Sequence, residues 1–455
     1  MPFSRQNVPR TKIFLASGIV ASVFVILLSL RGVMNSTLSS PSIANIHVDH
    51  QPSSISNLHA EQYTPAPPHV DDIFSSAETV ESKDYHDWNA RTLRDLYSCI
   101  SMKNCGKNQQ KIALLASHWF EEAVVRGWRG GEGIWGMSIY KNLRLMGYTT
   151  LFANSFEEAL EQYRLFPDLV KVVIRNRAGE CHENPHCVKG PMNPRGIPAW
   201  KIFDFEFFPS VGGHPYATPL GGKWILSANP DPRFIAEEDS PLQYIGYSIE
   251  EDCQKIPVVR LYHRSNQVWM LMKQIKYVYD DRFTWNRSYF SMAAQELEMN
   301  FVGGWMLDQH YLGWDPKTQG DMPDIADPGH GVINFGPLSM DDFMAHVGLS
   351  KAMVGVGNPF WSPSPYNALC QGVPFINPII NWKKDEPWNK SHWHTQHPSL
   401  NQFEPPFIPQ HMTELAVRER LKRLMETDWK ELAASLLEQR VQEVKSGKKV
   451  YIFEL

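Results

Sequence analysis

The sequence has no surplus of positive charge. Its 44 Lys and Arg residues are outnumbered by 49 Asp and Glu residues, which gives a formal net charge of -5 at pH 7. A protein that binds a nucleic-acid backbone needs a basic surface to do so. The composition therefore argues against nucleic acid as a partner.

Charged residues are also absent from the segment 13–30, an uncharged apolar run near the start of the chain. A helix of that length can cross about 30 Å of hydrocarbon. Three basic residues precede the run, so the positive-inside rule places 1–12 in the cytoplasm and the rest of the chain in the lumen. A cleaved signal peptide is the alternative. Its apolar core usually ends at a small-residue site, whereas Arg31 and Met34 follow here.

Residues 31–85 lack any sustained helical or strand period. They are rich in Ser, Pro and His, a composition typical of a flexible stem. A tail at 1–12, an anchor at 13–30, this stem and a large lumenal part form the layout of a single-pass type II enzyme of the Golgi membrane. Asn286 and Asn389 each begin a sequon, which is consistent with a glycosylated lumenal chain.

Cysteine is scarce, with six residues in 455. Cys99 and Cys105, like Cys181 and Cys187, are close enough in the chain to form local disulfides in an oxidising compartment. The spacing does not fix the pairing. The segment 181–187 also contains two histidines, which leaves a zinc site as an alternative. Because ligands crowded around a proline fit tetrahedral zinc poorly, we expect no metal.

Short apolar runs alternate with amphipathic segments from Lys111 onward, a pattern typical of parallel α/β units. The expected strands are 111–117, 148–153, 170–174, 223–227, 242–249, 267–273, 300–307, 331–335, 352–356 and 373–376. The expected helices lie at about 133–147, 156–166, 285–298, 340–347 and 365–371, with one long helix at 413–444. We therefore predict two Rossmann-like domains, 86–260 and 261–410, followed by a C-terminal helix within 411–455.

Ligands of parallel sheets bind beyond the carboxyl ends of the strands. In the first domain the loop 128–136 is rich in glycine, and Glu132 is its only carboxylate. Glycines allow a ligand to approach the backbone, and a helix start offers free N–H groups. Glu132 could be a general base that takes a proton from a hydroxyl group. It could equally be a first-turn acid that the helix dipole favours.

Two loops of the second domain run from a strand into a helix, at 334–339 and within 353–378. Ser339 is a plausible N-cap of the first helix, and no Asp or Glu occurs in 353–378. Two helix N-termini converging from neighbouring strands would bind a diphosphate without metal or lysine. Taken singly, each loop is an ordinary strand-to-helix turn.

Several runs of this second domain resemble the α-1,6-mannosylglycoprotein 6-β-N-acetylglucosaminyltransferases, glycosyltransferase family 18. The runs are GVINFGPLS at 331–339, SKAMVGVGNP at 350–359, SPYNAL at 364–369, QGVPFINP at 371–378 and TQHP at 395–398. The segment WILSANPDPRF at 224–234 and the pair Gly131-Glu132 resemble the family more faintly. The likeness spans about residues 112–410.

The resemblance implies a GT-B fold and an inverting transfer of GlcNAc from UDP-GlcNAc to a mannose hydroxyl of a glycoprotein N-glycan, forming a β-1,6 branch. It implies no metal and no other cofactor. By spacing, Glu132 matches the catalytic base of the family. The matched runs and the nearby loop supply the candidate donor-binding residues, which are Gly336, Leu338, Ser339, Gly357, Pro365, Asn367, Ala368, Gln371, Lys390, Gln396 and His397. Gln396 and His397 could instead cap their own loop.

The chain departs from the family pattern at Trp361 and Asn367, where the family has Glu. Those acids belong to the donor site, so two other functions stay open: a GT-B transferase with a different nucleotide sugar or acceptor, and a catalytically silent glycan-binding protein. A metal-dependent transferase with an Asp-x-Asp motif is a further alternative. The nearest candidates, at 279–281 and 340–342, lack that spacing.

Overall fold

The computed structural model describes residues 84–208, 218–235, 240–279, 285–307, 315–320, 322–401 and 412–455. The expected tail, anchor and nearly all of the stem lie outside this part of the chain. Within the described residues, no helix is both long enough and apolar enough to cross a membrane.

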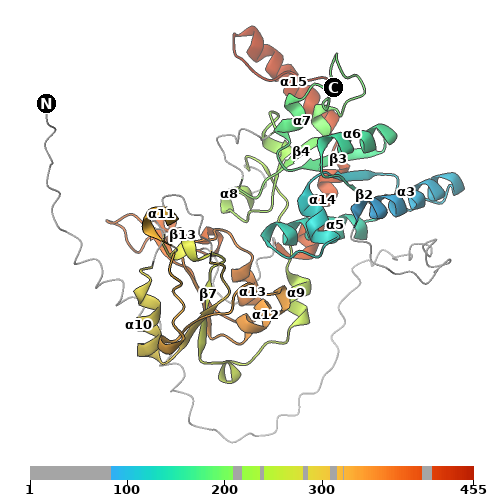
Figure 1. Ribbon diagram of the computed structural model, residues 1–455. Helices are drawn as coiled ribbons and strands as arrows, with labels where there is room; N and C mark the ends of the chain where they lie inside the picture. The colour runs from blue at the N-terminus through green and yellow to red at the C-terminus, as the bar shows by residue number, and fades with distance from the viewer. Residues whose placement is uncertain are drawn as a thin grey trace, which may run out of the picture. The chain divides into compact units, whose positions relative to one another are not determined.

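The first domain is built on a parallel sheet (Figure 1). Its strands, in the order β2-β1-β3-β4-β5-β6, are β1 (Ile112–Leu115), β2 (Thr149–Phe152), β3 (Val170–Arg175), β4 (Ile202–Phe205), β5 (Ile225–Ser227) and β6 (Gln243–Tyr244). Alternate residues of β1 belong to the hydrophobic clusters on the two faces of the sheet. Burial on both faces explains the continuous apolar runs in the sequence. The expected strand at 242–249 is shorter because the chain turns at Gly246, where φ is 73°.

Helices cover both faces of this sheet. They are α4 (His118–Val124), α5 (Gly131–Leu145), α6 (Phe156–Leu165), α7 (Gly179–Glu183) and α8 (Pro232–Ile235). The short helix α9 (Glu250–Lys255) follows them in the chain and lies against the second domain. An additional helix that the sequence reasoning missed, α3 (Tyr85–Met102), lies along the edge strand β2. The Asn89 amide exchanges two hydrogen bonds of 2.8 Å with the backbone of Phe152. These bonds satisfy backbone groups that an edge strand would otherwise leave open.

The second domain contains another parallel sheet, in the order β11-β10-β7-β8-β9. Its strands are β7 (Gln267–Leu271), β8 (Asn300–Gly303), β9 (Val332–Asn334), β10 (Ala352–Gly355) and β11 (Phe375–Ile376). Its helices are α10 (Ser288–Leu297), α11 (Pro316–Gln319), α12 (Met340–Gly348) and α13 (Ser364–Cys370). A short antiparallel pair, β12 (Ile379–Asn381) and β13 (His394–Thr395), was not predicted. The remaining helical turns are 3₁₀ turns at Ala199–Lys201, Gly222–Trp224, Leu261–His263, Ile275–Val278, Pro328–His330, Lys390–His392 and Pro398–Asn401.

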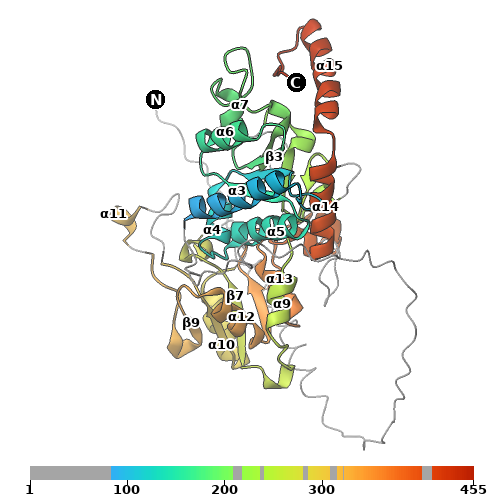
Figure 2. The same ribbon diagram turned by 90° about the vertical axis from the view of Figure 1, so that its right-hand side faces the viewer.

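The long C-terminal helix expected at 413–444 is two helices, α14 (Glu414–Glu426) and α15 (Trp429–Lys445). Asp428 interrupts the helix because its side chain accepts hydrogen bonds from the N–H groups of Lys430 and Glu431, which caps α15. Figure 2 shows α14 beside α5 of the first domain. Two Rossmann-like domains, with a C-terminal segment that returns to the first, form the GT-B arrangement.

The structure pairs Cys99 with Cys105 and Cys181 with Cys187, and it adds a third disulfide between Cys253 and Cys370. The Cys181–Cys187 bond occupies the two thiols that the alternative zinc site would need. The third bond joins α9 to α13 across 117 residues of sequence. It therefore attaches α13, a helix of the second domain, to the segment that leaves the first.

Asp204 is an ionisable residue in the middle of the first sheet. Its side chain is fully buried, and Oδ1 accepts a hydrogen bond of 3.0 Å from the N–H of Ala178. Among the described residues, Oδ2 has no hydrogen-bond partner. Burial, together with the nearby charge of Glu206, raises the pKa of Asp204 to about 7. The folded protein therefore retains a proton here over a pH range in which an unfolded Asp has lost it.

Replacing Asp204 with Asn should stabilise the protein at pH 8. An unfolded Asp releases its proton near pH 4 and the folded one near pH 7, so the wild-type stability should fall as the pH rises between these values. Asp204→Asn keeps an acceptor oxygen for Ala178 and removes this fall, a gain of up to roughly 4 kcal/mol at pH 8. Denaturant unfolding between pH 4 and pH 8 measures the effect.

Asp168→Asn is the control for this experiment, because Asp168 is exposed. It should give no comparable gain in unfolding free energy at pH 8. Equal pH dependence in wild type and Asp204→Asn would show that the Asp204 carboxyl is already ionised in the fold below pH 7.

Candidate active site

Each sheet has one place where the order of its strands reverses. In the first sheet this place lies between β1 and β3, and in the second it lies between β7 and β10. The chain leaves such neighbouring strands toward opposite faces, which opens a crevice beyond their carboxyl ends. One predicted site loop precedes α5 and comes after β1 and the short helix α4. The other directly follows β10.

The glycine-rich turn before α5 is shaped by Trp128. A Cβ at Gly130 would overlap the Trp128 ring, and a Cβ at Gly133 would overlap the Trp128 carbonyl oxygen. The sequence reasoning attributed these glycines to close approach of a ligand. In the structure they instead admit the indole of the same turn.

Glu132 lies in the first turn of α5 and is partly exposed. Its carboxylate forms no hydrogen bond or ion pair with any described residue. The preceding residue, Gly131, lies against the second domain, since a Cβ built on it would be 3.8 Å from Cδ of Pro363. The structure therefore brings the candidate base beside the loop that leads into α13.

Gln396 holds the loop after β10 in place through hydrogen bonds. This side chain is fully buried, its Oε1 accepts a hydrogen bond of 2.8 Å from the Gly357 N–H, and its Nε2 donates one of 3.0 Å to the Pro359 carbonyl. A Cβ at Gly355 would overlap Gln396 Oε1. Gln396 thus has the loop-capping role that the sequence left open beside donor binding.

His397 is fully buried and holds the same loop. Its Nε2 lies 2.8 Å from the Ser362 carbonyl oxygen, and its Nδ1 lies 3.1 Å from Ser399 Oγ. Burial lowers the pKa of His397 to about 4, against the smaller raising effect of the Ser362 carbonyl. At neutral pH this imidazole is uncharged, so in this arrangement it supplies no positive charge to a diphosphate.

Trp361 stands in this loop in a left-handed conformation, with φ of 58°. Such a conformation strains a bulky residue and is retained where the surroundings impose it. Here the Trp361 N–H donates to the Gln396 carbonyl at 3.4 Å, and the ring meets His397 edge-on at 5.8 Å. Trp361 is therefore part of the loop packing.

Asn367 does not reach the surface. Its exposed fraction is 1%, and Nδ2 lies 3.1 Å from the sulfur of Met344 in α12. Gln371, one turn further, is equally buried and donates to the Asn367 carbonyl at 3.3 Å. The side-chain oxygens of both residues have no partner among the described atoms. The structure thus places these two donor-binding candidates inside the domain, between α13 and α12.

The start of α12 is capped locally. Ser339 Oγ accepts from the Asp342 N–H at 3.1 Å and donates to the Asp342 carboxylate at 2.7 Å, and Asp341 adds a second acid to the first turn. The Gly336 N–H donates to the Asn334 side chain. The expectation that this helix and α13 start from neighbouring strands is wrong, because β7 and β8 lie between β9 and β10. Two carboxylates at its N-terminus make α12 a poor anion site.

The other candidates are distributed between core and surface. Pro365 and Ala368 are buried in α13, and Leu338 packs partly against the hydrophobic cluster on one face of the second sheet. Lys390 is exposed in a 3₁₀ turn. Lys273, which the sequence reasoning missed, is exposed directly after β7 at the crevice of the second sheet.

Both sequon asparagines in the described part are exposed. Asn286 Oδ1 accepts from the N–H of Ser288 at 3.1 Å and from its hydroxyl at 3.0 Å. Asn389 Oδ1 makes the corresponding bonds to Ser391, at 3.2 and 2.7 Å. Each acceptor amide is therefore on the surface with its sequon hydroxyl beside it.

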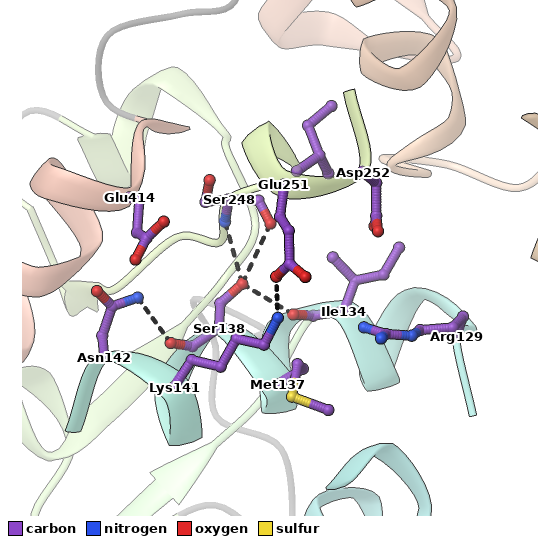
Figure 3. A pocket seen from close by; sticks show the side chains of 11 residues that line it. Arg129, Ile134, Met137, Ser138, Lys141, Asn142, Ser248, Glu251, Asp252 and Glu414 are labelled. Carbon is purple, nitrogen blue, oxygen red and sulfur yellow. Dashed lines mark hydrogen bonds and ion pairs between the residues drawn. The ribbon is translucent and has the colours of Figure 1, made fainter. Parts of the chain in front are cut away.

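A small hollow lies along a different flank of α5 (Figure 3). Ser138 Oγ donates to the Ile134 carbonyl and accepts from the Ser248 N–H, and Lys141 forms an ion pair with Glu251. The hydrogen bond from Lys141, followed in size by one from Lys255, lowers the pKa of the Glu251 carboxyl to about 2. Because its polar groups bond mainly to one another, this hollow is a packing seam between α5, α9 and α14. Glu132 does not line it.

No family model matches the sequence, and no curated protein matches it. Among solved structures, the chain is similar to the iron-containing heptosyltransferase TibC, solved with ADP-D-β-D-heptose (12% identity, 73% of this chain and 78% of that chain, TM-score 0.28). It is also similar to the glycotransferase of kitacinnamycin (11% identity, 72% and 94%, TM-score 0.33) and to MurG of Acinetobacter baumannii (10% identity, 69% and 90%, TM-score 0.29). Likeness at this level assigns no residue of the chain to a site.

Asn367→Asp tests whether this residue lies inside the domain. The substitution keeps the shape, but it puts a carboxylate where Met344 is the side-chain partner, and a buried unpaired charge is costly. We expect a loss of about 2–5 kcal/mol in unfolding free energy at pH 8. The loss should be smaller at pH 5, where the carboxyl can stay protonated.

Asn381→Asp, at an exposed position in β12, is the matched control and should be nearly neutral. Denaturant unfolding at both pH values gives the comparison. A well-tolerated Asn367→Asp with no pH-dependent loss would show that the side chain faces solvent or a ligand site.

Proposed function

We propose that the chain is an inverting glycosyltransferase in which Glu132 is the catalytic base. The observation that carries this proposal is an unpaired carboxylate in the first turn of α5, next to a residue that contacts the β10 loop of the other domain through Pro363. A base in this position can meet an acceptor held by the first domain and a donor held by the second.

The reaction needs one proton transfer and one substitution. The Glu132 carboxylate takes the proton of an acceptor hydroxyl. The acceptor oxygen then attacks C1 of the donor sugar from the face opposite the diphosphate. The new C1–O bond forms as the bond from C1 to the phosphate oxygen breaks, so the nucleoside diphosphate leaves and the configuration at C1 inverts.

The donor is proposed to bind in the crevice between β7 and β10. Lys273 is exposed just beyond the end of β7, and the hydroxyls of Ser362 and Ser364 lie at the entrance to α13. Positive charge and hydroxyl donors stabilise a departing diphosphate. The resemblance within 331–398 supports UDP-GlcNAc as donor and a mannose hydroxyl of a glycoprotein N-glycan as acceptor, giving a β-1,6 branch.

A membrane-anchored lumenal enzyme of the Golgi is proposed on two grounds. One is the apolar run at 13–30 with its basic flank. The other is the pair of exposed sequons at Asn286 and Asn389. A glycoprotein N-glycan would be available as acceptor in that compartment.

A silent glycan-binding protein of the same fold is the second candidate. It is favoured by the loss of both family acids, since Trp361 is engaged in loop packing and Asn367 is buried. The two functions differ in whether Glu132 is used for chemistry.

Glu132→Gln separates them. Glutamine keeps the size of the side chain and can still donate a hydrogen bond, but it cannot accept the proton of the acceptor. We expect kcat to fall by on the order of 10²–10⁴ while nucleotide binding is unchanged. Steady-state rates with UDP-GlcNAc and a mannose-terminated N-glycan, and calorimetric titration with UDP, provide the two measurements.

Glu157→Gln is the matched control, because Glu157 is a first-turn acid of α6 and is exposed. It removes the same interaction with a helix dipole and should leave kcat unaltered. Unchanged turnover in a folded Glu132→Gln variant would exclude Glu132 as the base. Absence of turnover in the wild type, with glycan binding intact, would favour the silent binder.

Activity should survive removal of divalent cations. In the proposed mechanism Lys273 and the serine hydroxyls interact with the diphosphate, and no step needs a metal. EDTA is added in about 10-fold molar excess over total divalent cation. We expect the transfer rate to stay within about twofold of the rate without EDTA. Loss of activity that manganese restores would require a metal-dependent mechanism instead.

A further inference from the structure

The rings of His118, Trp119 and Trp128 lie one beside the next near Glu132 and form an aromatic ladder. His118 and Trp119 are adjacent at the start of α4, with ring centroids 4.2 Å apart. The Trp119 ring stacks on Trp128 at 5.3 Å with an angle of 23° between their planes. Because α4 directly follows β1, the ladder begins at the crevice where the order of the first sheet reverses.

The ladder is not part of the hydrophobic core. His118 is exposed, Trp119 and Trp128 are partly exposed, and neither tryptophan belongs to a core cluster of the described residues. Neither indole N–H donates to a described atom. Tryptophan at the surface with a free N–H is typical of binding sites, because one side chain offers both an apolar face and a donor.

The residues on either side of Glu132 touch the ladder and the donor loop, respectively. Gly133 lies against Trp128, and Gly131 lies against Pro363. Glu132 therefore stands between an aromatic surface of the first domain and the β10 loop of the second. A base that acts between an acceptor and a donor needs one substrate surface on each side of it.

We propose that His118, Trp119 and Trp128 form the platform on which a hexopyranose ring of the acceptor oligosaccharide stacks. The inference rests on the proposed function and names the acceptor subsite of that same site. One face of a pyranose carries mainly C–H groups, which pack against the electron-rich face of an indole. The indole and imidazole N–H groups can donate to the ring hydroxyls. A sugar held in this way presents a hydroxyl to Glu132, with the donor on the Pro363 side.

The test compares Trp119→Leu with Trp119→Phe in the full-length protein. Leucine keeps apolar volume and removes the ring, whereas phenylalanine keeps a ring. We expect Trp119→Leu to raise the KM for a mannose-terminated N-glycan by about 10- to 100-fold, taking as a guide the loss measured when the aromatic ring under a stacked nucleobase is removed. Trp119→Phe should recover most of the loss, and UDP binding should be unchanged in both.

His118→Ala is the second variant, because its exposed side chain can be removed without disturbing the turn at Gly130. It should raise the same KM by about 3- to 10-fold. Tyr262→Leu is the control, since Tyr262 is 71% exposed and lies outside the site. Should Trp119→Leu fail to fold, as judged by circular dichroism, His118→Ala decides.

A direct glycan-binding measurement distinguishes failure of this inference from failure of the proposed function. Transfer with an unchanged KM in folded Trp119→Leu and in His118→Ala would overturn the platform and leave the transferase intact. No transfer by the wild type, but glycan binding that Trp119→Leu abolishes, would support the platform and reject the transferase. A wild type that neither transfers nor binds the glycan would overturn both.

Discussion

The contact between the Trp128 ring and the turn at Gly130 and Gly133 determines where Glu132 stands. Because Trp128 fills the space that a Cβ would need at either glycine, mainly with its ring at Gly130 and its carbonyl oxygen at Gly133, the turn is compact. α5 begins immediately after it, and Glu132 is therefore held at the end of a rigid helix. A side chain on a packed helix keeps its position better than one on a free loop.

The conformation of the loop after β10 depends on buried polar groups. Gln396 and His397 together hold the backbone of 357–362 through bonds to Gly357, Pro359 and Ser362. A buried polar side chain is costly unless it is bonded, so these two residues specify one loop conformation. This role accounts for their complete burial.

Local sequence patterns predicted much of the fold, and distant contacts account for what they missed. Continuous apolar runs identified β1, β3, β7 and β10, since buried parallel strands have no polar face. β4 was missed because the buried Asp204 interrupts its apolar run. The break at Asp428 depends on capping, and the Cys253–Cys370 bond depends on α9 meeting α13. For the site, spacing located Glu132 beside a glycine turn, but whether Asn367 faces outward depends on the packing of α13 against Met344.

The packing around positions 361 and 367 suits the residues found there. A carboxylate at 367 would lie beside the Met344 sulfur, in a site with no described cation, so the neutral amide suits the observed packing of α13 on α12. The Trp361 ring packs edge-on against His397, and its backbone N–H donates to the backbone carbonyl of Gln396. Both positions belong to the segment proposed to bind the donor, and they flank Pro363, against which Gly131 lies. On the proposed function, this chain therefore differs from the family in how the donor is recognised, and it keeps the position of the base.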